Sequence, residues 1–314
     1  MNKTNIMIQS NKSEIIKIQP YGKGDLLVEN LKRVNESAES GTSKATHSWI
    51  KQGNSYFIGR KPNTDSIPSA QYEIRSSMEQ GVWLEKINVL TDDIFVFPDP
   101  IIDEILIDME KFWSLRAKYA EYGITYKRGV LVHGKPGVGK SVLTNVLAKE
   151  ITSKHNGIVI NVSQLHTFIP IAHQLRALEP DKPILAIIDE LEEFIYNNST
   201  KDFLNLLDGN IQIDNVCYIA TTNYIDRIEP RIKSRPSRFD IVYEVQYPSP
   251  ETREFFIKRK LKEEDLKNID ISTWVRDTKG MSFAHIKELI ISVIVMGNDY
   301  DKTIFRLKNM MEIS

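Results

Sequence analysis

Short apolar runs alternate with amphipathic segments through the middle of this chain. Between the runs, apolar residues recur at helical spacing, as Val142, Leu143, Val146 and Leu147 do within residues 141–150. Runs that are nearly all apolar predict strands buried on both faces, and helices between them predict a parallel sheet. The pattern therefore predicts an α/β unit with a five-stranded parallel sheet. Its strands are expected in residues 128–133, 157–162, 184–190, 216–220 and 241–245.

The N-terminal part of the chain has a different texture. Residues 1 to about 48 are polar, and residues 37–48 have the Ser, Thr, Gly and Lys content of a linker. Apolar residues then alternate with polar ones around Gly53 and Asn54, which predicts a small β-hairpin. We interpret residues 1–90 as a small β-containing domain. It serves either as a platform for substrates or adaptors or as a packing appendage that steadies an oligomer, and the sequence favours neither.

Helical patterns fill the rest of the chain. An apolar stripe from Ile101 to Trp113 predicts an amphipathic helix that begins at Pro100 and ends near Gly123. From Glu251 onward the chain is helical in pattern, and Ser282 is a good N-cap for one of these helices. The predicted organisation is therefore an N-terminal domain (1–90), a large α/β domain (91–249) and a small helical domain (250–314).

Composition narrows the class of protein. The chain has 314 residues and a net charge of −1, which gives no bulk electrostatic case for nucleic acid or an anionic membrane. Its single cysteine, Cys217, lies in an apolar run, which predicts a buried structural thiol and a reducing compartment. No apolar run approaches the ~20 residues of a membrane span. We expect a cytoplasmic protein without membrane contact.

A glycine-rich motif supplies the strongest chemical signal. Residues 134–141 read G-x-x-x-x-G-K-S, between a predicted strand and a predicted helix. Glycines let the backbone curl until several N–H groups point at one phosphate, and the helix N-terminus adds partial positive charge. Lys140 supplies a charge for the β- and γ-phosphates, and Ser141 a hydroxyl for Mg²⁺.

Two carboxylates close the apolar run that begins at Ile184. Asp189 and Glu190 fall at the carboxyl end of a predicted parallel strand, where such sheets bind ligands. We assign Asp189 to Mg²⁺ and Glu190 to activation of a water for attack on the γ-phosphate. The alternative is an acid pair favoured by the dipole of the next helix. Glu192 and Glu193 are predicted to lie on a solvated face.

Two further features have alternative interpretations. Asn223 follows the run at 216–220, and its amide either meets the γ-phosphate or attacking water or caps the next turn. Residues 231–240 form a basic cluster that fits nucleic-acid phosphates, or the nucleotide of a neighbouring subunit, where transition-state charge needs a guanidinium.

In this order and at these strand ends, the motifs of residues 91–297 resemble those of the AAA ATPases. The resemblance implies Walker A at 134–141, Walker B at 184–190, Asn223 as sensor 1, and a lid segment at 278–285 that closes over adenine. It implies that Arg235 and Arg238 act on the nucleotide of the adjacent subunit. It also implies that Asn161 is at the position that holds the catalytic Glu inactive until substrate engages. The implied catalytic residues are Glu190, Lys140, Asn223, Arg235 and Arg238. The implied ATP contacts are Gly134, Lys135, Pro136, Gly137, Val138, Gly139, Lys140, Ser141, Val142 and Ala284, with Ser141 and Asp189 on Mg²⁺.

The resemblance also implies a homo-oligomeric ring, a hexamer, with ATP between subunits and a central pore that pulls on protein. The chain looks most like single-ring members of bacteria and phages, related to the mitochondrial translocase for folded Rieske protein, which implies a bacterial or phage-infected host cell. Many threading members carry a glycine in the first pore loop, and the matching residues 165–170 lack one. Phe168 and Ile169 are the expected pore residues here. No H-E-x-x-H zinc motif is present in the sequence.

The favoured function is an ATP-driven motor that remodels or unfolds a protein client. A motor linked to DNA or RNA is the second interpretation, and near-neutral charge disfavours it. A nucleotide-gated assembly scaffold is the third.

Overall fold

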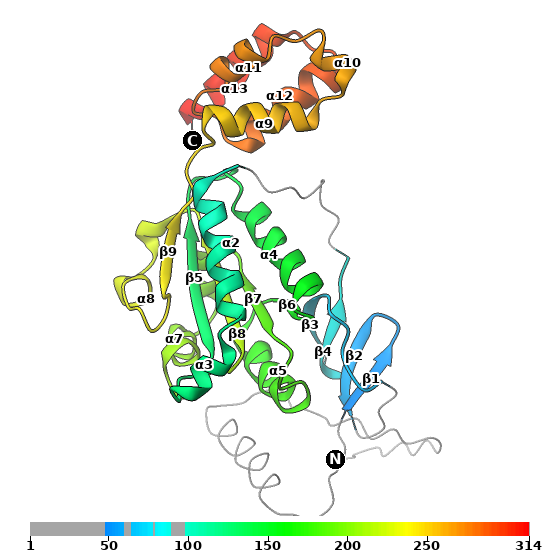
Figure 1. The fold of residues 1–314 in the computed structure, drawn as a ribbon, viewed down its shortest axis with the longest axis vertical. Coiled ribbons are helices and arrows are strands. Elements are labelled where there is room, and N and C mark those ends of the chain that lie inside the picture. Colours follow the sequence, from blue (N-terminus) through cyan, green and yellow to red (C-terminus); the bar gives the residue numbers. More distant parts are fainter. Residues whose placement is uncertain (1–47, 60–63, 78, 89–97, 314) are drawn as a thin grey trace, which may run out of the picture.

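The computed structural model describes residues 48–59, 64–77, 79–88 and 98–313. The predicted polar N-terminal stretch and the predicted start of the large domain at Thr91 lie outside these residues. One sheet dominates the described part, with the strand order β1-β2-β4-β3-β6-β7-β8-β5-β9 (Figure 1). The sheet thus has nine strands rather than the five expected.

All five predicted strands are present and parallel. They are β5 (Lys127–His133), β6 (Ile158–Asn161), β7 (Ile184–Ile188), β8 (Val216–Thr222) and β9 (Ile241–Glu244). In space β8 lies between β5 and β7, so the chain segments that follow these three strands emerge side by side. This order brings the glycine-rich motif and the acid pair to the same edge of the sheet.

The four additional strands come from the N-terminal segment. They are β1 (Ser48–Gln52), β2 (Ser55–Gly59), β3 (Gln71–Ser77) and β4 (Gly81–Lys86). The predicted hairpin is β1 and β2, which pair antiparallel across Gly53. Strand β3 then pairs parallel with β6, from Gln71↔Val159 to Glu73↔Asn161. The described N-terminal residues therefore continue the main sheet, a pairing that alternation within residues 71–77 could not reveal.

Residues of the central strands alternate between two apolar cores. Val130 and Val132 pack into one, together with α2 (Pro100–Trp113), α4 (Lys140–Lys154) and much of the C-terminal helical unit. Leu131 packs into the other, with α5 (Leu165–Leu178), α6 (Leu191–Asn197) and α7 (Thr200–Asp208). Cys217 is fully buried in the first core, and burial raises the pKa of its thiol. It is a structural residue.

The helix predicted from Pro100 to Gly123 is two helices. The first, α2, ends at Trp113, and α3 (Arg116–Glu121) follows. Ser114 causes the break, because its hydroxyl and its N–H both donate to Lys111 O and tighten the last turn.

The C-terminal unit is entirely helical in the described residues, and Figure 1 shows it beyond one end of the sheet. It contains α9 (Pro250–Lys260), α10 (Glu263–Leu266), α11 (Ile271–Asp277), α12 (Phe283–Ile290), a π-helical segment (Ile291–Val295) and α13 (Tyr300–Ile313). Short helices η1 (Ile225–Arg227) and α8 (Pro230–Lys233) precede β9. Across residues 48–59, 64–77, 79–88 and 98–313, every helix is too short or too polar to cross a membrane.

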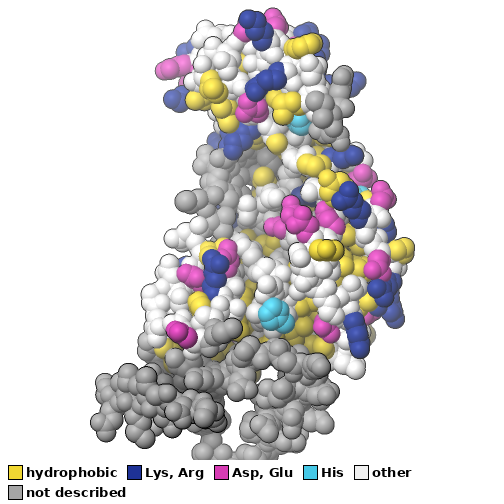
Figure 2. Space-filling model, turned by 180° about the vertical axis from the view of Figure 1, so that it is seen from behind, with side chains coloured by type: hydrophobic (Ala, Val, Ile, Leu, Met, Phe, Trp, Pro, Cys, Tyr) yellow, Lys and Arg dark blue, Asp and Glu magenta, His cyan; other side chains and the backbone are white. Residues whose placement is uncertain are grey.

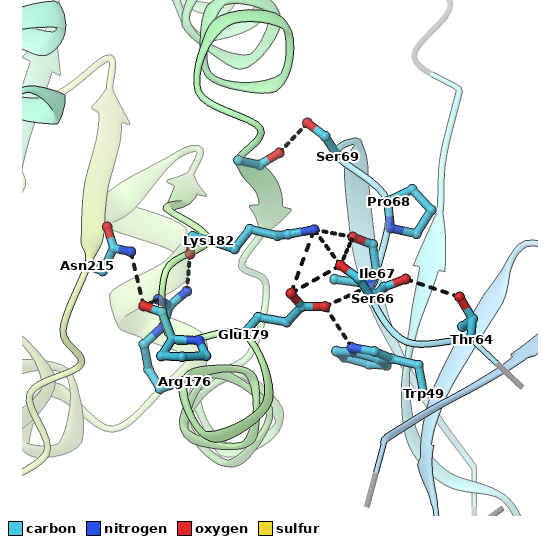
Figure 3. A network of polar contacts seen from close by, with 12 residues as sticks. Trp49, Thr64, Ser66, Ile67, Pro68, Ser69, Arg176, Glu179, Lys182 and Asn215 are labelled. Carbon is cyan, nitrogen blue, oxygen red and sulfur yellow. Dashed lines mark hydrogen bonds and ion pairs between the residues drawn. The ribbon is translucent and has the colours of Figure 1, made fainter. Parts of the chain in front are cut away.

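A polar network fastens the N-terminal strands to the sheet (Figure 3). The Glu179 carboxylate accepts hydrogen bonds from Trp49 Nε1 at 3.0 Å and from the Ile67 N–H at 2.7 Å. Lys182 lies 3.8 Å from the same carboxylate and donates to Ile67 O. The side chains of Glu179 and Lys182 are only 11% and 7% exposed, so this ion pair is screened little by water.

We expect Glu179→Ala to lower the free energy of unfolding by about 3–5 kcal/mol, because it leaves the Lys182 charge buried without its partner. Urea unfolding followed by circular dichroism measures this. The matched control is Glu85→Ala, which breaks the exposed pair of Glu85 with Arg75 and should cost at most about 1 kcal/mol. Equal losses for the two variants would show that the network does not fasten the strands.

Candidate active site

The glycine-rich motif forms the turn between β5 and α4. Gly137 has φ +76° and Gly139 has φ +110°, a backbone region that side chains with a Cβ rarely adopt. Residue 139 immediately precedes α4, so the loop leads directly into a helix N-terminus. The structure thus confirms the strand–loop–helix context that the sequence predicted.

The Lys140 ammonium lies inside this turn and is held by three protein oxygens. It donates to Gly134 O at 2.7 Å, to Lys135 O at 2.9 Å and to Asn223 Oδ1 at 2.6 Å. Burial lowers the pKa of Lys140, while the nearby carboxylates of Glu192 and Asp189 raise it. Asn223 is therefore hydrogen-bonded to Lys140 of the glycine-rich motif. The capping bond of the next turn runs instead from the Tyr224 N–H to Thr222 Oγ1.

The carboxyl end of β8 connects the loop to the acidic turn after β7. Thr221 Oγ1 donates to Asp189 Oδ1 at 3.0 Å, and Thr222 Oγ1 donates to Glu192 Oε2 at 2.6 Å. Because β8 is the only strand between β5 and β7, the two strand ends are about 10 Å apart. That spacing accommodates a phosphate chain and a hydrated cation.

Glu190 has an unusual backbone. Its φ of +51° is in the left-handed region, which costs a non-glycine residue of order 1–3 kcal/mol. The side chain is exposed, and Glu190 O accepts the N–H groups of Glu193 and Phe194 at the start of α6. The turn therefore presents the Glu190 carboxylate at the edge of the sheet and at a helix N-terminus together.

The two arginines differ in exposure. Arg235 is 62% exposed and lies 3.4 Å from Asp208, whereas Arg238 is 8% exposed and donates to the same carboxylate at 2.9 Å. Their segment packs at the start of β5, where the Asp240 N–H donates to Gly129 O. Gly129 and Gly134 are separated by five residues of extended chain, about 16 Å. Neither arginine is placed to reach the glycine-rich loop of its own chain.

The C-terminal helical unit contacts the glycine-rich loop at the start of α12. A Cβ on Gly137 would lie 2.7 Å from Ser282 Oγ and 2.9 Å from the Ala284 Cβ, so the two segments are in close contact. Ser282 caps α12 by accepting the His285 N–H, and its hydroxyl also lies 2.7 Å from His285 Nδ1. Ala284 is thus beside the loop, and its contact with a nucleotide stays a prediction.

The expected pore residues are not at the surface. Residues 165–170 form the first turns of α5, where Phe168 is 0% and Ile169 is 5% exposed. Phe168 packs edge-on against Tyr218 of β8, with 6.4 Å between ring centroids. In this conformation neither side chain can contact a client, and the expectation was wrong because a helix turns both residues into the core.

Asn161 ends β6, and its Oδ1 accepts a hydrogen bond from Gln71 Nε2 of β3 at 3.0 Å. Its amide is thereby tied to the N-terminal strands. The proposed restraint of Glu190 by Asn161 stays a prediction.

Comparison with known proteins shows what this site is similar to. Residues 130–247 match the model of the ATPase family associated with various cellular activities (AAA). The glycine-rich loop, the acidic turn and Asn223 all lie within these matching residues.

The chain is also similar to curated proteins, including the following three. A proteasome-activating nucleotidase of Pyrococcus abyssi is 30% identical over 189 residues, which are 54% of this chain and 47% of the relative. The ATP-dependent zinc metalloprotease FtsH 2 of a Thermoanaerobacter species is 28% identical over 259 residues, 77% of this chain and 50% of the relative. A proteasome-activating nucleotidase of Saccharolobus solfataricus is 28% identical over 278 residues, 79% and 67% respectively. The chain spans about half the length of the first two.

The donor set of the candidate site fits Mg²⁺ bound together with phosphates. Ser141 and Asp189 are both exposed and offer one hydroxyl and one carboxylate. Within the part of the chain that the structure describes, no group of three or more His, Cys, Asp or Glu side chains could hold a metal alone. Mg²⁺ commonly keeps several waters and takes substrate phosphates as ligands, so two protein oxygens suffice.

Sequence reasoning missed the position of Glu192 within the candidate site. We expected it on a solvated face with Glu193, but it is half-buried and bonded to Thr222. No local pattern signals this contact, because it depends on Thr222, at the end of a strand later in the chain.

Proposed function

We propose that this chain is an ATP-driven motor of the AAA type that acts on protein clients. Three neighbouring strand ends carry the proposal, because they gather the Lys140 ammonium, the Asn223 amide and the acidic turn at 189–192 around one glycine-rich loop. The names of the relatives support protein clients, since they refer to a proteasome and to a protease.

In this proposal, residues 134–142 bind ATP, and Ala284 of the helical unit covers the nucleotide. Lys140 exchanges Asn223 Oδ1 for phosphate oxygens, which frees the amide to orient the attacking water. Glu190 accepts a proton from that water. Ser141 and Asp189 hold Mg²⁺, which would neutralise charge on the phosphates.

We further propose a homo-oligomeric ring in which Arg235 completes the site of the adjacent subunit. Its exposed guanidinium and its distance from the loop of its own chain support action in trans. Hexameric stoichiometry, a trans role for Arg238 and kinship with single-ring relatives of the Rieske-protein translocase are finer proposals. Residues 112–113 and 127–129 support the last of them.

A nucleic-acid motor is the weaker candidate. Figure 2 shows basic and acidic side chains interspersed on the face seen from behind, without a continuous basic stripe there. The net charge of −1 agrees with that surface. Binding to a polyanion normally needs a concentration of Lys and Arg.

We expect the full chain to hydrolyse ATP in the presence of Mg²⁺, and an unfolded globular protein to stimulate hydrolysis while single-stranded DNA does not. Phosphate release measures both. Lys140→Met should weaken ATP binding by about tenfold or more, because a charge-assisted hydrogen bond is lost. Stimulation by DNA alone would favour the nucleic-acid motor, and binding without turnover would favour the scaffold.

A further inference from the structure

We propose that Glu192 is a positioning residue for hydrolysis, which holds Asn223 in place through the hydroxyl of Thr222. This inference rests on the proposed ATPase function and extends it to a residue outside the expected site. Glu192 is on α6 and Asn223 follows β8, so the contact links the acidic turn to the residue that meets Lys140.

The Thr222 hydroxyl makes two bonds that leave it little freedom. It donates its only hydrogen to Glu192 Oε2 at 2.6 Å and accepts the Tyr224 N–H at 3.0 Å. Thr222 is 1% exposed, so water cannot readily replace the carboxylate as acceptor. Loss of the acceptor would leave a buried hydroxyl unpaired, a change that costs more than the bond itself contributes.

Asn223 is the residue between the two ends of this arrangement. Its neighbours on both sides, Thr222 and Tyr224, are joined through the Thr222 hydroxyl, which holds the backbone on either side of Asn223. From that position Asn223 Oδ1 reaches Lys140 Nζ at 2.6 Å. Glu192 therefore controls where the amide lies without touching the nucleotide.

The charge of Glu192 also acts at the loop. Glu192 and Asp189 are carboxylates that act electrostatically on Lys140. Substitutions can separate this effect from the hydrogen bond, because glutamine keeps an acceptor oxygen and loses the charge.

The experiment compares steady-state ATP hydrolysis by the full chain and four variants. Glu192→Ala should lower kcat about tenfold, the usual scale for loss of an orienting partner, while the KM for ATP changes less than about twofold. Glu192→Gln should recover most of the rate, because its amide oxygen still accepts from Thr222. Thr222→Val should lower kcat at least as much as Glu192→Ala, because it removes the same bond and also the acceptor of the Tyr224 N–H. Glu193→Ala, the exposed acid on the same helix, is the control and should leave the rate unchanged.

Combining Glu192→Ala with Thr222→Val should cost no more than Thr222→Val alone, since Thr222→Val already removes the bond to Glu192. A merely structural contribution would instead lower thermal stability in both variants without this non-additive effect on kcat. Wild-type kcat in Glu192→Ala or in Thr222→Val overturns the inference, as does a glutamine variant no faster than alanine. If Glu192→Ala does not fold, Thr222→Val decides alone. Failure of the proposed ATPase function is distinguishable, because the unaltered chain would then not hydrolyse ATP.

Discussion

Glu190→Gln is expected to retain ATP and to hydrolyse it about 10²–10⁴-fold more slowly, the range for loss of a general base. The amide keeps the size and hydrogen-bonding reach of the carboxylate but cannot take a proton from water at neutral pH. ATP retention is measured with the nucleotide in excess and turnover by phosphate release. The variant should hold nucleotide as well as the unaltered chain does.

The backbone of Glu190 makes this substitution informative. Glutamine at φ +51° carries about the same strain as glutamate, so the fold should keep its stability and any lost rate reports chemistry. Glu193→Gln is the matched control, since it removes a carboxylate from the exposed side of the same helix. Undiminished hydrolysis by Glu190→Gln would show that another group in the site acts as the base.

The central strands could be predicted from sequence because a strand that is buried on both faces is apolar at nearly every position. Residues 184–188 are all apolar, and in the structure they alternate between the two cores. No comparable sequence pattern identified the strand that pairs with β3. Strand β3 pairs with β6 through backbone hydrogen bonds, which any residue except proline can make. The side-chain bond from Gln71 Nε2 to Asn161 Oδ1 forms only once the two strands are paired, so the parallel pairing could be seen only in the structure.

The site divides in the same way. Lys140, Asp189 and Asn223 could be proposed because each occupies a fixed place after an apolar run. Glu192 could not, because its importance depends on the Thr222 hydroxyl, 30 residues further along the chain. Phe168 shows the opposite error. An aromatic residue at a helix start fits a core or a surface equally well. Because the ring of Phe168 is fully buried, a substitution there would mainly report folding.

Arg235→Ala is expected to lower hydrolysis about 10³-fold or more while ATP binding stays intact, the scale seen when a guanidinium is removed from transferred phosphate. The change removes an exposed side chain whose ion pair with Asp208 is long, so the fold should lose little stability. Arg231→Ala is the matched control, because Arg231 belongs to the same basic cluster and is 57% exposed. Hydrolysis by the control should equal that of the unaltered chain.

A mixture of two inactive variants tests where Arg235 acts. Lys140→Met subunits bind ATP weakly but keep Arg235, and Arg235→Ala subunits hold ATP but lack the guanidinium. In a ring with head-to-tail contacts, about a quarter of the interfaces in a random equal mixture join an intact loop to an intact arginine. Hydrolysis should therefore return to a measurable fraction of the original rate. If subunits are shown to exchange and no activity returns, Arg235 does not act across the interface, and its solvent-exposed position at the start of β5 needs another explanation.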